Sequence, residues 1–108
     1  MIQCLASISS FYTSRDVFSF QVVLYNRKAL SERLSNAQVT IGYATDGKGN
    51  AVCNNTGDTT GMYVIEVNCA KTLEGRYVTV TVPNNALTLC EVEVIGKPSG
   101  KVQFKLNY

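Results

Sequence analysis

The chain has 108 residues, of which 45% are hydrophobic and 17% are charged, and its ten basic residues exceed its eight acidic ones by two. This length fits one domain and the apolar fraction fits a packed core, so a solenoid, a coiled coil and a multidomain enzyme are excluded. The sequence contains no histidine, which excludes Ser-His-Asp and Cys-His nucleophiles, histidine metal sites and an imidazole pH switch.

The small positive charge comes from basic residues that are scattered along the chain, so nucleic acid is not an expected partner. No apolar run approaches the roughly 18 to 20 residues that a membrane-spanning helix needs, so no membrane span is expected. Residues 1–12 lack the basic and apolar regions of a secretory signal, and the sequence as written is therefore not addressed for export.

Strands separated by polar turns are the dominant pattern. In chain order we expect strands at 17–25, 38–43, 62–68, 77–82, 88–95 and 101–106, with one short helical piece at 28–34 and a turn at 96–100. Pro83 ends the fourth strand because proline lacks the N–H that a ladder needs. Short strands with turn signals about every 8 to 15 residues are typical of an antiparallel β-sandwich or jelly roll, so an all-β fold is predicted.

Two of these strands show a clear alternation of faces. In 77–82 we expect Val78, Val80 and Val82 to share one face. In 88–95 one face holds Leu89, Glu91 and Glu93, and the other holds Cys90, Val92 and Val94. Function in such folds usually lies in the loops at one end, so the loops to consider are 26–36, 44–61, 70–75 and 83–88.

The cysteines favour an oxidising compartment. Cys4, Cys53, Cys69 and Cys90 have no Cys-x-x-Cys spacing, which speaks against a zinc ribbon or a thioredoxin-type site and favours a disulfide framework. Asn54-Asn55-Thr56 is an acceptor for N-glycosylation in a secreted chain. Both features predict a secreted protein, and an upstream segment would reconcile them with the missing export signal.

Several segments together resemble the F-type lectins, also called fucolectins, over residues 17–95. The matching segments are Asn26-Arg27-Lys28, Ser31–Ala37, Ile41-Gly42, Cys53, Cys69, Glu74-Gly75-Arg76-Tyr77-Val78, Pro83 and Leu87–Val94. The resemblance implies a galactose-binding-like, discoidin-related jelly roll that binds terminal L-fucose and holds a structural calcium. It leaves residues 1–16 as a divergent N-terminal segment and 96–108 as a C-terminal extension or edge strand.

The implied sugar site consists of arginines. Members of the family use a His and an Arg-x-Asp-x4-Arg motif whose vicinal disulfide stacks on the sugar. Arg27 matches the first arginine and Arg33 the second, so both are implied carbohydrate-binding residues. Between them Ala29-Leu30 replaces Asp-Cys-Cys, the spacing is one residue shorter, and the His is missing, so the site is partly degraded. The alternative is that both are exposed loop arginines or partners of Glu32 and a neighbouring carboxylate.

The implied calcium site is closed by the backbone carbonyl of Cys90 and the carboxylate of Glu91. Its opening half belongs several tens of residues ahead of residue 17, where this chain has sixteen. Calcium takes six to eight oxygens, so two ligands do not hold it, and the alternative for Glu91 is a strand-end carboxylate in solvent. Residues 46–50 resemble a calcium loop only superficially, and a hairpin turn is expected there. The carboxylate pair of Glu91 and Glu93, the sole enzyme candidate, is better explained by solvation.

The resemblance also implies disulfides. Cys53 and Cys69 match the family pair, and closing a loop of about 15 residues stabilises a fold by roughly 3 kcal/mol in the chain-entropy model. Cys4 is the remaining partner for Cys90, with free thiols as the alternative. The sequence thus predicts a lectin-like, non-enzymatic module for fucosylated glycans, in which homo-oligomers would raise avidity. The competing hypothesis is a structural or interaction sandwich that has lost its sugar site.

Overall fold

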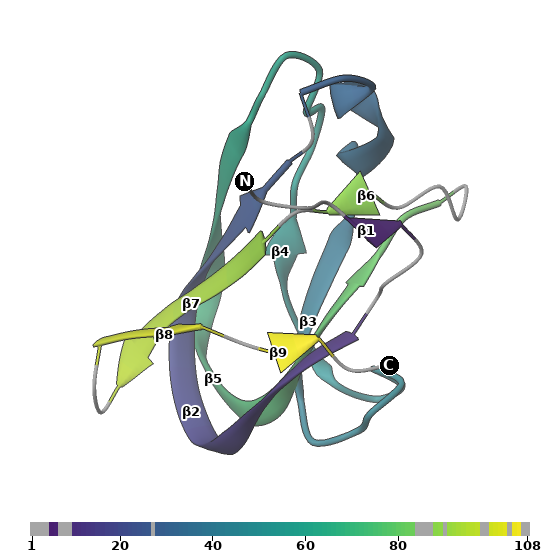
Figure 1. Ribbon diagram of the computed structural model, residues 1–108. Helices are drawn as coiled ribbons and strands as arrows, with labels where there is room; N and C mark the ends of the chain where they lie inside the picture. The colour runs from purple at the N-terminus through teal and green to yellow at the C-terminus, as the bar shows by residue number, and fades with distance from the viewer. Residues whose placement is uncertain are drawn as a thin grey trace.

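The computed structural model describes residues 5–6, 10–26, 28–83, 88–89, 91–97, 100–103 and 105–106. The elements in these ranges are β1 (Leu5–Ala6), β2 (Ser10–Tyr25), η1 (Ser31–Leu34), β3 (Gln38–Gly42), β4 (Ala51–Asn55), β5 (Val64–Thr81), β6 (Thr88–Leu89), β7 (Glu91–Lys97), β8 (Gly100–Gln103) and β9 (Lys105–Leu106) (Figure 1). The strand pairs are antiparallel. The predicted all-β antiparallel class is therefore confirmed.

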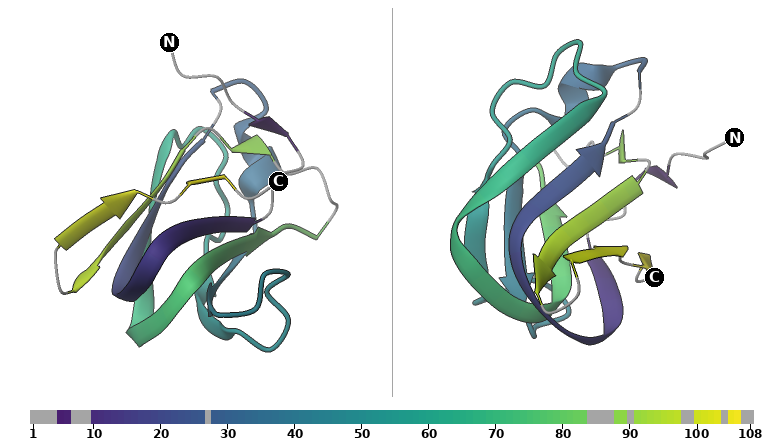
Figure 2. Two further views of the ribbon diagram at one scale, coloured as in Figure 1. Left: turned by 60° about the horizontal axis from the view of Figure 1, so that its bottom comes forward. Right: turned by 90° about the vertical axis from the view of Figure 1, so that its left-hand side faces the viewer.

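Two long strands run through both layers of the sandwich. The larger sheet has the order β4-β3-β5-β2-β7-β8, and β9 also pairs with β2. β2 and β5 have 16 and 18 residues, and their pairing shifts register between Tyr12 and Val17 and again between Ser19 and Gln21. Figure 2 shows both strands curving strongly through this region. The bend lets one continuous pair of strands supply two facing layers.

The registers define which half of each long strand belongs to which layer. β3 pairs with the end of β5, from Tyr77 to Thr81, and β9 pairs with the start of β2. β7 pairs with the second half of β2, from Phe18 to Tyr25. The same half of β2 pairs on its other side with the first half of β5. One layer therefore contains β4, β3, the second half of β5, the start of β2 and β9. The other layer contains the first half of β5, the second half of β2, β7 and β8.

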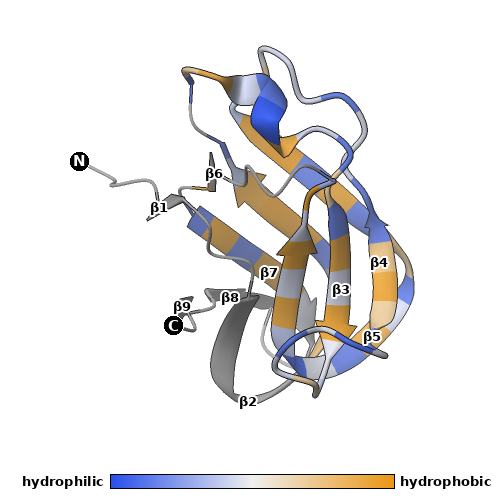
Figure 3. Ribbon diagram, turned by 90° about the vertical axis from the view of Figure 1, so that its right-hand side faces the viewer, coloured by the Kyte–Doolittle hydropathy of each residue, from blue (hydrophilic) through white to orange (hydrophobic). Residues whose placement is uncertain are grey.

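The core lies between these layers and follows from strand alternation. Its buried side chains are Val22, Leu24, Leu34, Ala37, Val39, Ile41, Cys53, Ile65, Val67, Leu73, Val78, Val80, Val82, Leu89, Val92 and Val94. Successive side chains on a strand point to opposite faces, and Figure 3 shows the resulting alternation of polar and apolar residues along the start of β7. The predicted shared face of Val78, Val80 and Val82 is confirmed.

The prediction for the 88–95 region is wrong in one respect. Leu89 is buried, although the alternation placed it on the same face as Glu91 and Glu93. The reason is that β6 ends at Leu89 and pairs with β1, while β7 begins at Glu91 and pairs with β2. The region holds two strands in different sheets, so the alternation does not carry across residue 90.

Three other expectations are corrected by the backbone. The strands expected at 62–68 and 77–82 are one strand, and the intervening loop at 70–75 is the strongly bent middle of β5. β4 lies inside the expected 44–61 loop, because it is only five residues long and shows no alternation of apolar and polar residues, with Cys53 alone buried on it. The helical piece at 28–34 is a single 3-10 turn. Within the described ranges, no helix is long and apolar enough to cross a membrane.

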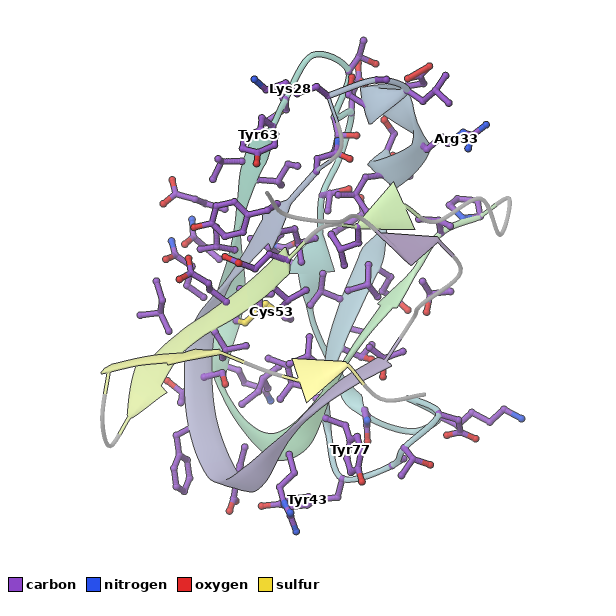
Figure 4. The ribbon with its side chains drawn as sticks, viewed as in Figure 1. Lys28, Arg33, Tyr43, Cys53, Tyr63 and Tyr77 are labelled. Atoms are coloured by element: carbon purple, nitrogen blue, oxygen red, sulfur yellow. A yellow bond between two sulfur atoms is a disulfide. The ribbon has the colours of Figure 1, made fainter. Side chains whose placement is uncertain are left out.

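The Cys53–Cys69 disulfide is confirmed, with its two Cα atoms 4.2 Å apart. β4 is the edge strand of one layer, and the first half of β5 is the edge of the other. The disulfide, seen beside the Cys53 label in Figure 4, therefore joins the two layers along one side of the sandwich. A hydrogen bond of 3.0 Å from Asn54 Nδ2 to the carbonyl of Asn68 joins the same two strands. Cys4 and Cys90 lie outside the described residues.

The turn expected at residues 46–50 is also confirmed. Lys48 donates its backbone N–H to Asp46 Oδ1 at 2.9 Å, and Gly47 donates to the carbonyl of Ala44 at 3.2 Å. The Asn50 amide both accepts from the Ala44 N–H and donates to its carbonyl. The side-chain oxygens that could have suggested a calcium loop thus close the connection between β3 and β4.

Candidate functional site

A buried asparagine joins two loops at the end of the sandwich where η1 lies. Asn26 has no exposed surface, and its backbone N–H donates to the carbonyl of Tyr63 at 2.7 Å. Its Nδ2 donates to the carbonyl of Ser31 at 2.8 Å and to that of Met62 at 3.1 Å. One side chain therefore holds the segment after β2 against the segment before β5. A buried amide without these partners would cost free energy, so the contact fixes both loops.

Hydroxyl groups add a second set of links between the same loops. Thr59, also fully buried, donates its hydroxyl to the carbonyl of Ser31 at 2.7 Å. Gly61 donates its N–H to Ser31 Oγ at 2.8 Å, and Thr59 donates its N–H to Ser35 Oγ at 2.9 Å. These hydrogen bonds hold the two loops together at this end of the sandwich and support the exposed side chains that they carry.

Only one of the two predicted sugar-binding arginines lies within the described residues. Arg27 lies outside the described residues. Arg33 is exposed on η1 and points away from the sandwich (Figure 4). Among the described residues no hydrogen bond or ion pair engages its guanidinium, so it does not pair with Glu32. The sequence left two alternatives to sugar binding for this residue, an exposed loop arginine or a partner of Glu32 and a neighbouring carboxylate. The structure shows the exposed arginine.

An apolar side chain lies in the same loop turn as Arg33. Leu30 is 43% exposed and has a left-handed backbone with φ of 59°, an uncommon conformation for leucine. Its carbonyl accepts the N–H of Arg33 at 3.1 Å, which closes the turn. The turn therefore presents a charged hydrogen-bond donor and an exposed apolar group together.

A second cluster, which we call the tyrosine platform, consists of Tyr25, Tyr63 and Lys28. The two rings meet edge to face with centroids 6.4 Å apart and an interplanar angle of 69°. Lys28 Nζ lies over the Tyr63 ring, 5.6 Å from its centroid. In Figure 4, Lys28 and Tyr63 lie on one side of the η1 loop, and Arg33 lies on its other side. Sequence patterns do not reveal this cluster, because Tyr25 and Lys28 come from one segment and Tyr63 comes from another that is distant in the sequence.

Beneath the platform, Glu93 contradicts the expectation of a solvated carboxylate. It is only 8% exposed, and the Tyr25 hydroxyl donates a hydrogen bond to its Oε1. This hydrogen bond, with a smaller contribution from burial, raises the pKa of Tyr25 to about 12. Glu91 is half-buried, and its charge acts in the same direction on that pKa. The two carboxylates are therefore not an equivalent exposed pair.

Replacing Tyr25 with phenylalanine is expected to remove one tyrosine from the high end of the phenolate absorbance titration. The other tyrosines serve as the internal reference, since an unperturbed phenol ionises near pH 10. Because the folded pKa is raised, the hydrogen bond contributes its full stability below about pH 10 and loses it as the pH rises through about 12. In urea unfolding, Tyr25→Phe should cost about 1 kcal/mol at pH 7 and less at pH 11. A cost that does not change with pH would contradict the assignment.

The calcium ligands implied by the resemblance are only partly within the described residues. Cys90 lies outside them, and Glu91 lies at the start of β7. In the described part of the chain, no group of three or more Cys, Asp or Glu side chains could hold a metal ion. The next carboxylate along this strand face, Glu93, accepts from Tyr25. Because calcium takes six to eight oxygens, the described residues do not fit the ion, and no binding step is assigned to it.

Comparison with known proteins places this architecture among lectins. No protein-family model matches the chain. A pentraxin fusion protein of Xenopus laevis is 39% identical over 71 residues, which are 62% of this chain and 17% of that protein. The crystal structure of a fucolectin from striped bass (Morone saxatilis) serum superposes with a TM-score of 0.72 and 30% identity, covering 82% of this chain and 31% of that chain. A fucose-binding module of Streptococcus pneumoniae has a TM-score of 0.61 and 19% identity, covering 88% of this chain and 72% of that one.

These neighbours confirm the resemblance to F-type lectins that the sequence motifs indicated, and the fold is a fucolectin β-sandwich. The pneumococcal module, at its lower identity, supports the fold alone. The chain spans less than a third of the striped bass protein and less than a fifth of the pentraxin fusion protein.

Proposed function

We propose that this chain is an extracellular carbohydrate-binding module that holds a terminal sugar of the L-fucose type against the loop at residues 26–36. The observation that supports this most directly is the turn that presents Arg33 and Leu30 together on a loop fixed by Asn26. The Cys53–Cys69 disulfide supports an oxidising compartment. A binding function, rather than catalysis, agrees with the likeness to the striped bass fucolectin.

The binding chemistry follows from the shape of the two groups. The guanidinium of Arg33 offers several N–H donors in one plane, which suit adjacent sugar hydroxyls. A 6-deoxy sugar also carries a methyl group and an apolar ring face. The exposed Leu30 side chain can cover this apolar surface and remove it from water. Binding is reversible and forms no covalent bond. Single sites of this kind are weak, so several copies on one surface would raise avidity.

The competing function is a sandwich that contacts another macromolecule without a sugar. It is motivated by the missing Asp and Cys pair between residues 27 and 33. Under this hypothesis the exposed Arg33 is a solvated surface charge, and the chain has no preference among immobilised glycans.

Arg33→Ala is expected to weaken retention on fucose-agarose by about tenfold or more, because a charged hydrogen-bond donor is lost. Lys48→Ala is the matched control, since it removes the same charge from an exposed side chain in the β3–β4 turn. Repeating the assay with a chelator tests whether retention depends on a divalent cation. If the wild-type chain is not retained on fucose or on a broad glycan panel, the competing function is correct. Equal losses in the two variants would show that Arg33 acts only through net charge.

A further inference from the structure

We propose that the tyrosine platform is a second saccharide contact, which takes a neutral sugar next to the terminal one. The inference rests on the proposed function, because it extends that site along an oligosaccharide. Tyr63 is the centre of the platform, since the residue is 39% exposed while its backbone carbonyl accepts a hydrogen bond from the Asn26 N–H. The stacking surface is thus attached directly to the asparagine that fixes the sugar loop.

The Tyr63 ring is held before any ligand arrives. The edge-to-face contact with Tyr25 and the Lys28 ammonium over its face limit the positions that the ring adopts. Tyr25 is itself fixed by the hydrogen bond from its hydroxyl to the buried Glu93. A ring that is already placed loses little conformational entropy on binding, and tyrosine offers a large amphipathic contact area. Rigid aromatic rings of this kind suit the C–H face of a pyranose.

The residues on either side of Tyr63 in the sequence are apolar and exposed. Met62 and Val64, which flank Tyr63, are 41% and 45% exposed. Three consecutive residues therefore present apolar surface at the start of β5. The exposed Lys28 ammonium lies beside this surface and can donate to sugar hydroxyls. The combination of a ring, an apolar border and a hydrogen-bond donor is suited to a saccharide rather than to a purely apolar partner.

The charges on this face select against acidic sugars. In the register, Tyr25 is opposite Glu91, and Val23 is opposite both Glu93 and Glu66. The side chains of Leu24, Ile65 and Val92, one position along on these strands, are in the core, so the carboxylates lie on the outer face with Tyr25. Lys28 is the single cation among these described neighbours. A sialylated or sulfated sugar would be repelled, whereas a neutral sugar can donate its hydroxyls to the half-buried Glu91 and the exposed Glu66.

The position of the platform requires more than one sugar residue. Lys28 and Tyr63 lie on one side of the η1 loop, and Arg33 lies on the other (Figure 4). A monosaccharide held by Arg33 therefore leaves the Tyr63 ring uncovered. The occupant that fits both is a neutral oligosaccharide whose terminal sugar contacts the loop and whose next residue stacks on the ring.

The experiment compares three ligands by calorimetry: methyl α-L-fucoside, the neutral Lewis x trisaccharide and its sialylated form. The full chain is expected to bind the neutral trisaccharide about tenfold more tightly than the monosaccharide and to bind the sialylated form more weakly than the neutral one. Tyr63→Ala should bind the trisaccharide no better than the monosaccharide, while Tyr63→Phe, which keeps the ring, should retain the preference.

Tyr43→Ala is the matched control. Tyr43 is 51% exposed, lies at the opposite end of the sandwich (Figure 4) and donates its hydroxyl to Glu74 Oε2 at 2.8 Å. Its removal should change neither affinity. Equal affinities of the wild type for the monosaccharide and the trisaccharide would overturn the second contact while leaving the proposed function intact. Binding of neither sugar would overturn the proposed function. Tighter binding of the sialylated form would overturn the charge argument, and with it the neutral occupant.

Discussion

Gly75→Ala is expected to lower the free energy of unfolding by about 3 kcal/mol or more, one of the largest effects of any single substitution in this chain. A Cβ atom at this position would lie 2.5 Å from the carbonyl oxygen of Gly42 and 2.6 Å from its Cα and nitrogen. All three atoms belong to the backbone of β3, so no side chain can turn aside to relieve the contact. For a domain of this size the change corresponds to a fall of roughly 10 to 20 °C in melting temperature.

The control for this substitution separates crowding from backbone strain. Gly61 has a φ of 76° and open space around its Cβ position, so Gly61→Ala adds strain without a clash. It should cost about 1 to 2 kcal/mol. Both values come from urea unfolding at pH 7, with the slope of the transition checked for constancy. If Gly61→Ala costs as much as Gly75→Ala, the close approach of β3 and β5 does not limit the side chain at residue 75.

The same contact explains part of the motif by which the sequence was related to F-type lectins. Glu74-Gly75-Arg76-Tyr77-Val78 reads as a turn followed by a strand, and both were predicted. In the structure the chain bends here without leaving the ladder, because the missing side chain at Gly75 lets β5 pass against Gly42. The sequence pattern identifies a glycine that interrupts the alternation of apolar and polar residues. Whether the strand ends or bends at that glycine depends on the neighbouring strand that packs against it, which the pattern does not show.

The core was predictable to the extent that single strands determine it. The alternation of valines after Tyr77 placed Val78, Val80 and Val82 correctly, since side-chain direction is a local property of a strand. Leu89 and Glu93 were misplaced because their burial depends on neighbours that are distant in the sequence. Leu89 belongs to the pair of β6 with β1, and Glu93 is covered at the Tyr25 hydroxyl.

The candidate site shows the same division. The loop at 26–36 and the exposed Arg33 follow from the motif, because loop arginines beside a strand end are visible in the sequence. The tyrosine platform does not, since Tyr25 and Tyr63 meet only once β2 and β5 are known to be neighbours. The available signal was weak but present: both tyrosines stand at the loop end of predicted strands, where an aromatic side chain often remains partly exposed.

Removal of the Cys53–Cys69 disulfide is the second large effect that we expect. The cross-link closes a sequence separation of 16 residues, so the Cys53→Ala, Cys69→Ala double variant should lose about 3 kcal/mol relative to the wild type. Loss of the buried Cys53 sulfur adds a small packing cost to this value. Urea unfolding of the two proteins under non-reducing conditions measures the difference.

The structure supplies a control because a second link joins the same two edges of the sandwich. Asn54→Ala removes the 3.0 Å hydrogen bond to the carbonyl of Asn68, which lies in an exposed position and should cost about 0.5 to 1 kcal/mol. If the double cysteine variant loses no more unfolding free energy than Asn54→Ala does, then removal of the disulfide gives the unfolded chain little additional conformational freedom. The expected larger loss would instead assign the cohesion of this side of the sandwich to the covalent link, because β4 contributes few buried side chains of its own.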